Sequence, residues 1–380
     1  MYDPKIGHRL IIAGDLFPTG ENVSYFAKGD IASLFGEEIV RLFDGADFSV
    51  CNLEGSLTDH SERCRKTGPV KVAPTAALAA YKGLGIQCCM LANNHSTDGG
   101  NQGMADTLQA LDAAGIGHIG AGLNSQSVGH SLVQMVGDVR FGFYNVSETM
   151  YNKPTEYSAG AWLYDEYLVC RELAELRREC DYLVVIYHGG IEKFPYPSPE
   201  MRKRFHRMAD SGADMILAQH THCIGCEEMY NGSYLLYGQG DFLLKNYLPG
   251  VTDTGLLLEL DVLDGPVTIK KHWVRSVDNL FVRLDEHPDL PGFAERSEKV
   301  KDEAYVLSQF KEFCAGELRL YLTAFKNPTG WWRRLQRKFF PRAYDKWLCG
   351  YTERNLLFTL HTLRSEQNRE TAIVGLENKL

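Results

Sequence analysis

The segment RLIIAGD, residues 9–15, places a run of apolar side chains directly before a polar end. A short apolar run without a helical repeat predicts a strand over residues 9–13, and Asp15 follows that strand. The segment FSVCNLEG, residues 48–55, repeats the arrangement with a predicted strand that leads to Glu54. Two strands that each lead to a carboxylate predict an α/β sheet with ligands at the carboxyl ends of its strands.

Patterns on either side of these segments alternate between strand and helix. Turn residues between apolar runs predict hairpins at Gly137-Asp138 and Asn231-Gly232. The mixture predicts an α/β domain with both parallel and antiparallel strands. The expected helices lie near residues 31–42, 74–84, 104–111, 166–178 and 201–209, and the further strands near 86–92, 116–119, 182–187, 214–218, 255–262 and 267–274.

Six polar residues stand at or just past the ends of five predicted strands: Asp15, Glu54, Asn94, His188, His220 and His222. Each alone could be a turn or surface residue, but together they predict a metal site at one sheet edge. Imidazoles with carboxylate and amide oxygens suit Mn, Fe or Zn better than Ca. On extended backbone residues two apart point to the same face, so His220 and His222 can contribute to one site.

The composition is that of an ordinary globular protein, with 44% hydrophobic and 23% charged residues in a chain of 380. The formal net charge is −9, so we expect no nucleic-acid partner. The ten cysteines have irregular spacings, which favours free thiols. The first residues lack a signal-peptide pattern and no apolar run approaches a spanning length, so we expect a cytoplasmic protein that reaches a membrane only through a partner or its own surface.

Several motifs also occur in a characteristic order. They resemble the CapA/PgsA family of capsule and poly-γ-glutamate synthesis proteins, a branch of the calcineurin-like metallophosphoesterase superfamily, over about residues 8 to 245. The motifs read Gly14-Asp15, Asn52-Leu53-Glu54-Gly55, Ala92-Asn93-Asn94-His95 with Asp98 and Gly100, His188-Gly189-Gly190-Ile191-Glu192, His220-Thr221-His222, and Tyr237-Gly238-Gln239-Gly240-Asp241-Phe242.

The resemblance implies a four-layer α/β/β/α sandwich. We expect the CapA-like metallophosphoesterase domain to span residues 1–285 and a mainly helical extension to span 286–380. The segment EHPDLPG, residues 286–292, reads as the linker between them.

The resemblance also implies two divalent metal ions, Mn, Fe or Zn. Six side chains would hold them: Asp15 and His222 the first ion, Asn94, His188 and His220 the second, and Glu54 both. His95 matches the histidine that contacts the leaving group, and Asp98 would orient its imidazole.

Three positions depart from the family pattern. The first superfamily motif is D-x-H, whereas this chain has Asp15-Leu16-Phe17, which leaves the first ion one ligand short. Asp241 stands where the family usually has asparagine, and Ala218-Gln219 where it often has Gly-His. We therefore expect metal binding, with a first site that is weak or completed by substrate.

The expected reaction is hydrolysis of a phosphate ester or related bond in a phosphorylated small molecule or anionic polymer. Two metal ions would activate a water, and His95 would protonate the leaving oxygen. The alternatives are a metal-binding scaffold subunit of a polymer synthesis machine and a two-metal amide or peptide hydrolase. The candidates for substrate binding are Arg63, Arg65, Lys66 and Lys71, in a loop that could equally be a solvated surface, and Glu192, which could equally be an exposed loop acid.

The last part of the chain reads as helical. Apolar residues from Val300 to Leu318 recur along one helical face. The stretch WWRRLQRKFF, residues 331–340, is basic and aromatic. Its pattern favours a helix that packs its aromatic rings on the main domain with its arginines outward. The alternative is a contact with an anionic membrane surface, an acidic polymer or a synthesis complex.

Overall fold

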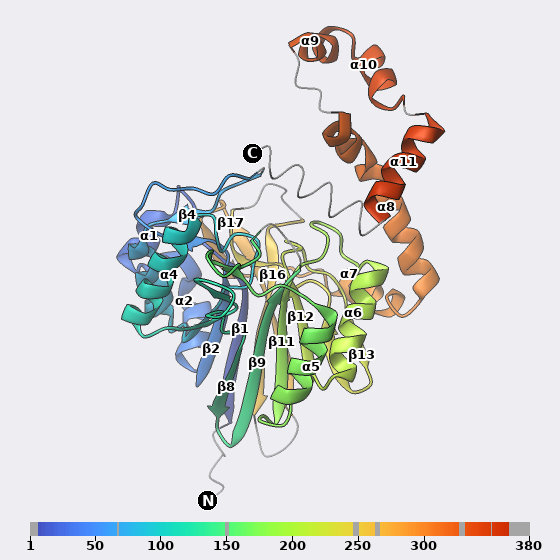
Figure 1. Ribbon diagram of the computed structural model, residues 1–380. Helices are drawn as coiled ribbons and strands as arrows, with labels where there is room; N and C mark the ends of the chain where they lie inside the picture. Colours follow the sequence, from blue (N-terminus) through green and yellow to red (C-terminus); the bar gives the residue numbers. More distant parts are fainter. Residues whose placement is uncertain are drawn as a thin grey trace, which may run out of the picture. The chain divides into compact units, whose positions relative to one another are not determined.

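The computed structural model describes residues 7–66, 68–148, 152–245, 251–262, 267–326, 331–350 and 352–364. Its main part has four layers: two sheets lie face to face, and helices cover the outer face of each (Figure 1). This confirms the predicted α/β/β/α sandwich.

The first sheet has β1 at its middle. β1 is parallel to β2 on one side and antiparallel to β16 on the other, and the short strand β15 pairs in parallel with its end. In spatial order the strands are β18 (Phe281–Leu284), β17 (Thr268–Val277), β16 (Thr254–Val262), β1 (His8–Leu16), β2 (Phe48–Leu53), β5 (Cys88–Met90) and β6 (Gly117–Ile119), with β15 (Asp241–Leu243) off this path.

The second sheet has parallel strands at its centre and an antiparallel strand at each edge. In spatial order the strands are β13 (Glu227–Tyr230), β14 (Ser233–Leu236), β12 (Met215–Gln219), β11 (Tyr182–His188), β9 (Val139–Ser147) and β8 (Ser131–Val136). Two short ladders lie outside both sheets: β3 (Ser56–Leu57) with β4 (Val72–Ala73), and β7 (Ala121–Gly122) with β10 (Gly160–Ala161).

β1 is buried on both faces, which explains why its sequence is a continuous apolar run rather than an alternating one. Leu10 and Ile12 belong to the core between the sheets. Ile11 and Ala13 belong to the core beneath the helices of the outer face. Those helices are α1 (Val23–Lys28), α2 (Ile31–Asp44), the 3₁₀ turn η1 (Thr75–Ala77), α3 (Leu78–Leu84) and α4 (Gly100–Ala114).

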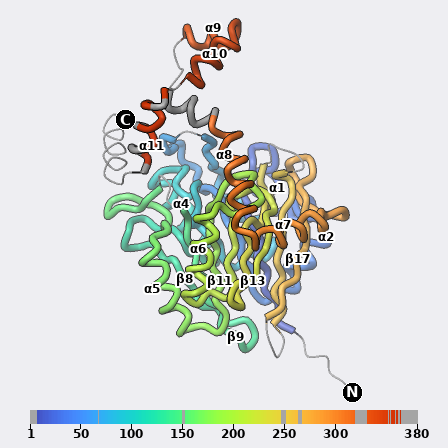
Figure 2. The backbone as a smooth tube through the Cα atoms, turned by 90° about the vertical axis from the view of Figure 1, so that its right-hand side faces the viewer, coloured from blue at the N-terminus to red at the C-terminus, as the bar shows by residue number. Residues whose placement is uncertain are grey.

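The outer face of the second sheet is covered by α5 (Glu166–Leu176) and α6 (Pro199–Asp210), which lie in front of its strands in Figure 2. Phe205 of α6 contacts Tyr187 of β11 and Tyr237, with ring centroids 5.5 and 5.1 Å away. This packing fixes the helix layer over the strand that ends in His188.

The structure contains the predicted strands and helices with small shifts of their ends. It adds short elements that the sequence did not predict, among them α1, β15 and β18, and it differs from two further expectations. Asp289 caps a helix, α7 (Leu290–Lys299), that begins inside the segment read as a linker, because its carboxylate accepts a hydrogen bond from the Gly292 amide. The apolar pattern that begins at Val300 spans two helices, since Val300 ends α7 and α8 (Glu303–Lys326) starts afterwards.

The chain divides into two compact units, residues 1–310 and 311–380, and the division falls inside α8. The second unit contains α9 (Trp331–Phe339), α10 (Pro341–Leu348) and α11 (Glu353–Arg364). The expected domain boundary at residue 285 stays a prediction, and residues 365–380 of the expected extension lie outside the described residues. Within the described part, we find no helix both long and apolar enough to span a membrane.

Candidate metal centre

The candidate site lies where strands of both sheets end at a common edge. Five of the six predicted metal ligands are buried, and His222 is partly buried. Parallel strands bring their carboxyl ends to the same side, so side chains far apart in sequence meet there. The first sheet supplies Asp15 on β1, Glu54 after β2 and Asn94 after β5, and the second supplies His188 on β11 and His220 and His222 after β12.

One group of possible ligands contains Asp15, His222 and Asp241, whose donor atoms lie within 4.8 Å of one another. Asp15 and Asp241 are register partners in the parallel pair of β1 and β15. His222 Nδ1 lies 2.8 Å from Asp241 Oδ1 and 3.7 Å from Asp15 Oδ2. The position predicted for the first ion therefore has three donor residues. The resemblance implied two for this ion, Asp15 and His222, besides the shared Glu54.

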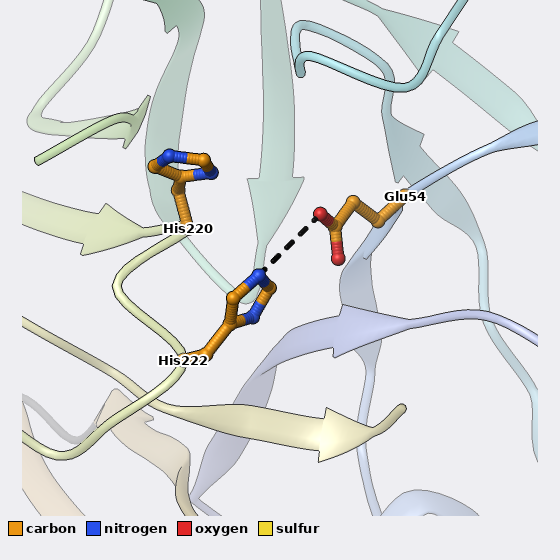
Figure 3. A group of neighbouring side chains, drawn as sticks. All are labelled: Glu54, His220 and His222. Atoms are coloured by element: carbon orange, nitrogen blue, oxygen red, sulfur yellow. Dashed lines mark ion pairs between the residues drawn. The ribbon is translucent and has the colours of Figure 1, made fainter. Parts of the chain in front are cut away.

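A second group contains Glu54, His220 and His222, again with donor atoms within 4.8 Å (Figure 3). His222 Nε2 lies 3.9 Å from Glu54 Oε1, the contact dashed in Figure 3. The two groups share His222, whose two ring nitrogens face different carboxylates. Such an arrangement offers neighbouring positions for cations rather than one isolated position.

His188 and Asn94, the other two predicted ligands, touch each other at the rim of this cluster. Asn94 Oδ1 lies 2.9 Å from His188 Nε2. The His188 ring lies 4.9 Å from the His220 ring, and its Nε2 lies 3.9 Å from Glu54 Oε1. All six predicted ligands are thus brought together, and their assignment to individual ions stays a prediction.

His220 and His222 both have an unusual backbone conformation. Both residues have positive φ angles, 87° and 52°, which are uncommon for residues other than glycine. The His220 amide also donates a hydrogen bond to Asp15 Oδ2 at 3.2 Å. The backbone at both histidines is therefore left-handed rather than extended, and such strain is concentrated at functional sites.

Phe17, in place of the first-motif histidine, is part of the wall rather than the ligand set. It is buried, and its ring packs so closely on Gly55 that a Cβ added there would lie 2.3 Å from Phe17 Cε2. Asp241 supplies a carboxylate to the same ion position. In this chain the histidine donor that Phe17 replaces is lost, and the carboxylate of Asp241 is gained.

The electrostatics of the cluster favour a bound cation. Burial, with the negative charges of Glu54 and Asp241, raises the pKa of Asp15 to about 8. Burial lowers the pKa of His222, but Asp241 and Glu54 outweigh it and raise the pKa to about 9. Burial and the positive charge of His222 lower the pKa of His220 to about 3, which keeps this imidazole neutral and able to bind a metal.

Two buried polar atoms, one of Glu54 and one of His220, show whether this donor set fits a metal ion. Among the described residues, Glu54 Oε2 and His220 Nδ1 are buried without a hydrogen-bond partner. Lys71 Nζ lies 2.7 Å from Glu54 Oε1. Burial alone would raise the pKa of Glu54, but Lys71, His222 and His188 hold it well below its usual range. A buried ionised carboxylate beside a neutral imidazole fits a divalent transition metal.

His95 and Asp98 form a pair beside the cluster. Asp98 Oδ2 lies 2.6 Å from His95 Nδ1, within hydrogen-bond distance, while His95 Nε2 lies 3.8 Å from Glu54 Oε1. The Lys71 amide donates to Asp98 Oδ2 at 2.6 Å, and the Lys66 ammonium binds Asp98 Oδ1. The pair is therefore held by the loop between Glu54 and α3, and burial lowers the pKa of His95.

The basic loop residues separate into two kinds. The side chain of Lys66 is buried and also lies 3.0 Å from His95 Nδ1. Arg63 is exposed and donates to the His60 and Glu62 carbonyls of its own loop, each at 2.6 Å. Arg65 is exposed. The structure brings the two lysines of this loop to the site, but neither arginine.

A pocket of about 630 Å³ opens beside the cluster. His95, His222 and Asp241 line it on the side of the candidate ligands. Lys71 and the exposed Glu192 line it as well, so two predicted substrate-binding residues border this space. The pocket gives a small molecule or a polymer segment access to the candidate centre.

A family model described as "Bacterial capsule synthesis protein PGA_cap" matches residues 9–246. The chain belongs to this family. The match covers the part of the chain in which the ordered motifs occur, and it confirms the resemblance that they indicate.

Curated relatives of this PGA_cap chain come from three bacteria. The capsule biosynthesis protein CapA of Bacillus anthracis is 27% identical over 191 residues, 49% of this chain and 46% of that protein. The PGA biosynthesis protein CapA of Bacillus subtilis (strain 168) is 25% identical over 221 residues, 57% and 58% of the two chains. A "Probable polyglutamine synthesis accessory protein" of Mycobacterium tuberculosis is 30% identical over 227 residues, 54% and 58%. The chain spans about half the length of these relatives.

Solved structures similar to this PGA_cap chain include a hypothetical protein from Thermus thermophilus, with a TM-score of 0.43 and 15% identity, covering 71% of this chain and all of that one. A novel phosphatase from Mycoplasma pneumoniae has a TM-score of 0.41 and 14% identity, covering 70% and 94%. TM-scores below 0.5 do not by themselves assign an activity to this chain.

Two asparagines with no role assigned from the sequence hold the candidate ligands of this PGA_cap chain in place. Asn93 Nδ2 donates to Asn52 Oδ1 at 3.0 Å, and Asn52 Nδ2 donates to Asp15 Oδ1 at 2.6 Å. Asn52 Nδ2 also lies 3.2 Å from His188 Nδ1. Both lie in the quoted motifs, close to Glu54 and Asn94. This closeness in sequence is the feature from which a role at the site could have been predicted.

Proposed function

We propose that this chain is a divalent-metal-dependent hydrolase that cleaves a phosphate ester in the synthesis of capsule, poly-γ-glutamate or another anionic polymer. The observation that carries the proposal is the pair of ligand groups that share His222, beside a pocket lined by His222, Asp241 and His95. The family membership supports the link to polymer synthesis.

The donor set supports two neighbouring cation positions. Asp15, His222 and Asp241 would hold one ion, and Glu54 and His220 would hold the other, with Asn94 and His188 beside it. When bound, such ions act as Lewis acids and lower the pKa of water. The protein's own contribution is to keep these donors fixed, through the β1–β15 pairing and the Asn52 hydrogen bond to Asp15.

The pocket supports an anionic substrate with an apolar part. Lys71, Lys193 and Lys245 line it, and a phosphate or carboxylate in it would be attracted by these ammonium groups. Its other walls are largely apolar, and Pro18 and Leu244 are among them. We infer that the lysines orient the anionic group with its scissile bond toward His95 and His222.

His95 would hand a proton to the leaving oxygen. Its Nε2 is turned toward the cluster, 3.8 Å from Glu54, and it lines the pocket. Asp98 holds Nδ1 at 2.6 Å, which fixes the ring orientation and stabilises the protonated imidazole. In this role His95 is a catalytic residue and Asp98 a positioning residue.

Metal content and turnover, measured on the same purified protein, test the proposal. We expect bound Mn, Fe or Zn and metal-dependent hydrolysis of generic phosphomonoesters or phosphodiesters. His95→Ala should keep the metal and lose about a hundredfold or more of the turnover. Asp241→Asn should bind the metal more weakly, since a neutral amide replaces a carboxylate donor.

Asp181→Asn is the matched control, because Asp181 is a surface carboxylate paired with Arg140 at the start of β11. It should leave both metal and turnover unchanged. Absence of metal from the parent protein, or full turnover in His95→Ala, would contradict the proposal.

The second candidate function is a metal-binding scaffold subunit. The ion pair between Lys71 and Glu54 favours it, because a lysine here partly neutralises a carboxylate proposed to bind an ion and would weaken its catalytic effect. Metal without turnover on phosphate esters would support this candidate. Turnover of γ-glutamyl peptides but not of phosphate esters would support the third, a two-metal amide hydrolase.

A further inference from the structure

Helix α9 separates its apolar and basic side chains onto different faces. At 3.6 residues per turn, Trp331, Trp332, Leu335 and Phe339 fall within about a third of the helix circumference. The rest of the circumference carries one glutamine and four basic residues: Arg333, Arg334, Arg337 and Lys338. A short helix with such a division has the pattern of an interfacial amphipathic helix.

The apolar face of α9 is open to solvent among the described residues. Trp331, Trp332 and Phe339 are 69%, 65% and 60% exposed, and no residue of α9 is buried. In contrast, Tyr344 and Leu348 of the next helix, α10, are buried.

α10 covers a different side of α9. The two helices lie next to each other (Figure 2), and the side chains of α9 that are partly covered are Arg333 and Gln336. The Arg333 guanidinium lies 3.8 Å from the centroid of the Trp347 ring of α10. The contact with α10 therefore uses the polar side and leaves the apolar face available.

Helices α9 and α10 together carry a net positive charge, whereas the whole chain is negatively charged. Residues 331–348 contain six basic residues and one acidic residue, while the whole chain has a formal net charge of −9. A local positive charge beside exposed tryptophans matches a surface that is negatively charged outside and apolar beneath.

We propose that α9 is a binding site for an anionic phospholipid surface. Trp331, Trp332 and Phe339 enter the boundary between headgroups and acyl chains, and Arg334, Arg337 and Lys338 lie at the level of the lipid phosphates. Tryptophan favours this boundary because it has an apolar ring and a polar N–H. An acidic polymer would engage the basic face but would leave the three aromatic rings in water, so the membrane surface fits more of the observed features.

Co-sedimentation of the full-length chain with phosphatidylglycerol-containing vesicles and with pure phosphatidylcholine vesicles tests the proposal. We expect binding to the first kind, weakened by salt. Each basic residue near an anionic surface strengthens binding about fivefold, so Arg334→Glu/Arg337→Glu/Lys338→Glu should weaken it at least about a hundredfold. Trp331→Ala/Trp332→Ala/Phe339→Ala should weaken it more than about tenfold.

Tyr157→Ala/Tyr167→Ala is the matched control, since these rings are 85% and 73% exposed in the first unit, and it should bind as the parent does. Trp331→Phe/Trp332→Phe should still bind but should lose most of the fluorescence quenching caused by brominated lipids. Failure of the parent to bind anionic vesicles overturns the proposal. So does unchanged vesicle binding by the triple alanine variant, and capture of free poly-γ-glutamate by that variant would then assign the basic face to a polymer.

Discussion

The carboxylate of Asp98 shows how one residue can organise several others. It forms hydrogen bonds with the His95 ring and with the Lys66 ammonium, and it accepts a hydrogen bond from the Lys71 backbone amide. The sequence suggested that Lys66 holds substrate, whereas its side chain is directed at Asp98 and His95 in the structure. Its charge therefore stabilises the pair that positions His95.

Lys66→Met distinguishes a positioning role from substrate binding. We expect kcat to fall about tenfold with little change in KM or metal content, because the lysine acts through Asp98 and His95. Lys66→Arg should restore part of the loss. Arg65→Met is the control from the same loop, since Arg65 is exposed, and it should match the parent. A rise in KM with unchanged kcat would instead return Lys66 to the substrate-binding set.

At the scale of elements, a buried network fastens α6 to β13 of the second sheet. Glu228 on β13 accepts from Arg202 Nη2 at 2.6 Å and from the Tyr237 hydroxyl at 2.8 Å. Burial alone would raise the pKa of Glu228, but its hydrogen bonds from Arg202 and Tyr237 lower it below the ordinary range. α6 in turn packs on β11, the strand that presents His188.

Glu228→Gln should weaken this attachment in a pH-dependent way. A depressed carboxyl pKa contributes stability that is present above the ordinary pKa of about 4.3 and is lost as pH falls through the folded value. We expect the variant to lose about 2 kcal/mol at neutral pH, and the difference from the parent to shrink in acid. Urea unfolding at several pH values measures it. Glu37→Gln, at an exposed pair with Arg41, should show no such dependence.

Elements with their own hydrophobic pattern could be predicted from the sequence, and elements defined by a partner could not. β2 spans residues 48–53 and ends directly before Glu54 as predicted, because its apolar run is sufficient to define a strand. β15 has three residues and exists through its pairing with β1, so Asp241 gave no sign that it would face Asp15. The segment 286–292 was predicted to be a linker, whereas α7 begins within it at Leu290, after its cap Asp289.

The same distinction holds in the candidate site. The six strand-end residues could be named because ligands gather at that edge whatever the details of packing. The left-handed turns at His220 and His222 and the asparagine contacts of Asp15 depend on neighbours that only the folded chain brings near. Membership of the PGA_cap family agrees with the motifs, and the individual metal assignments remain predictions.

At the scale of the whole molecule, the two sheets each supply part of one ligand cluster. Glu54 belongs to the first sheet and His222 to the second, and they lie 3.9 Å apart. A cation held between them would link the two halves of the sandwich. It would also offset the repulsion among the buried carboxylates of Asp15, Glu54 and Asp241.

Removal of metal should therefore lower the melting temperature. A ligand present at a hundred times its Kd stabilises the folded state by about 2.7 kcal/mol, which corresponds to roughly 4 °C for a unit of this size. Differential scanning calorimetry with EDTA and with added Mn measures the shift. His188→Ala/His220→Ala should melt at one temperature under both conditions, and an equally small shift in the parent would argue against a metal that joins the sheets.

The central place of β1 has a consequence for how the protein is made. A ribosome completes β1 by residue 16, but its antiparallel partner β16 begins at residue 254. At about 5–20 residues per second, β1 spends on the order of ten seconds or more with that edge unpaired. An unpaired apolar strand is prone to aggregate, so the nascent chain is expected to need a chaperone during this interval. Asp15 gains its partner Asp241 only at the same late stage, so a cation held by this pair would be captured when synthesis of the sandwich is nearly finished.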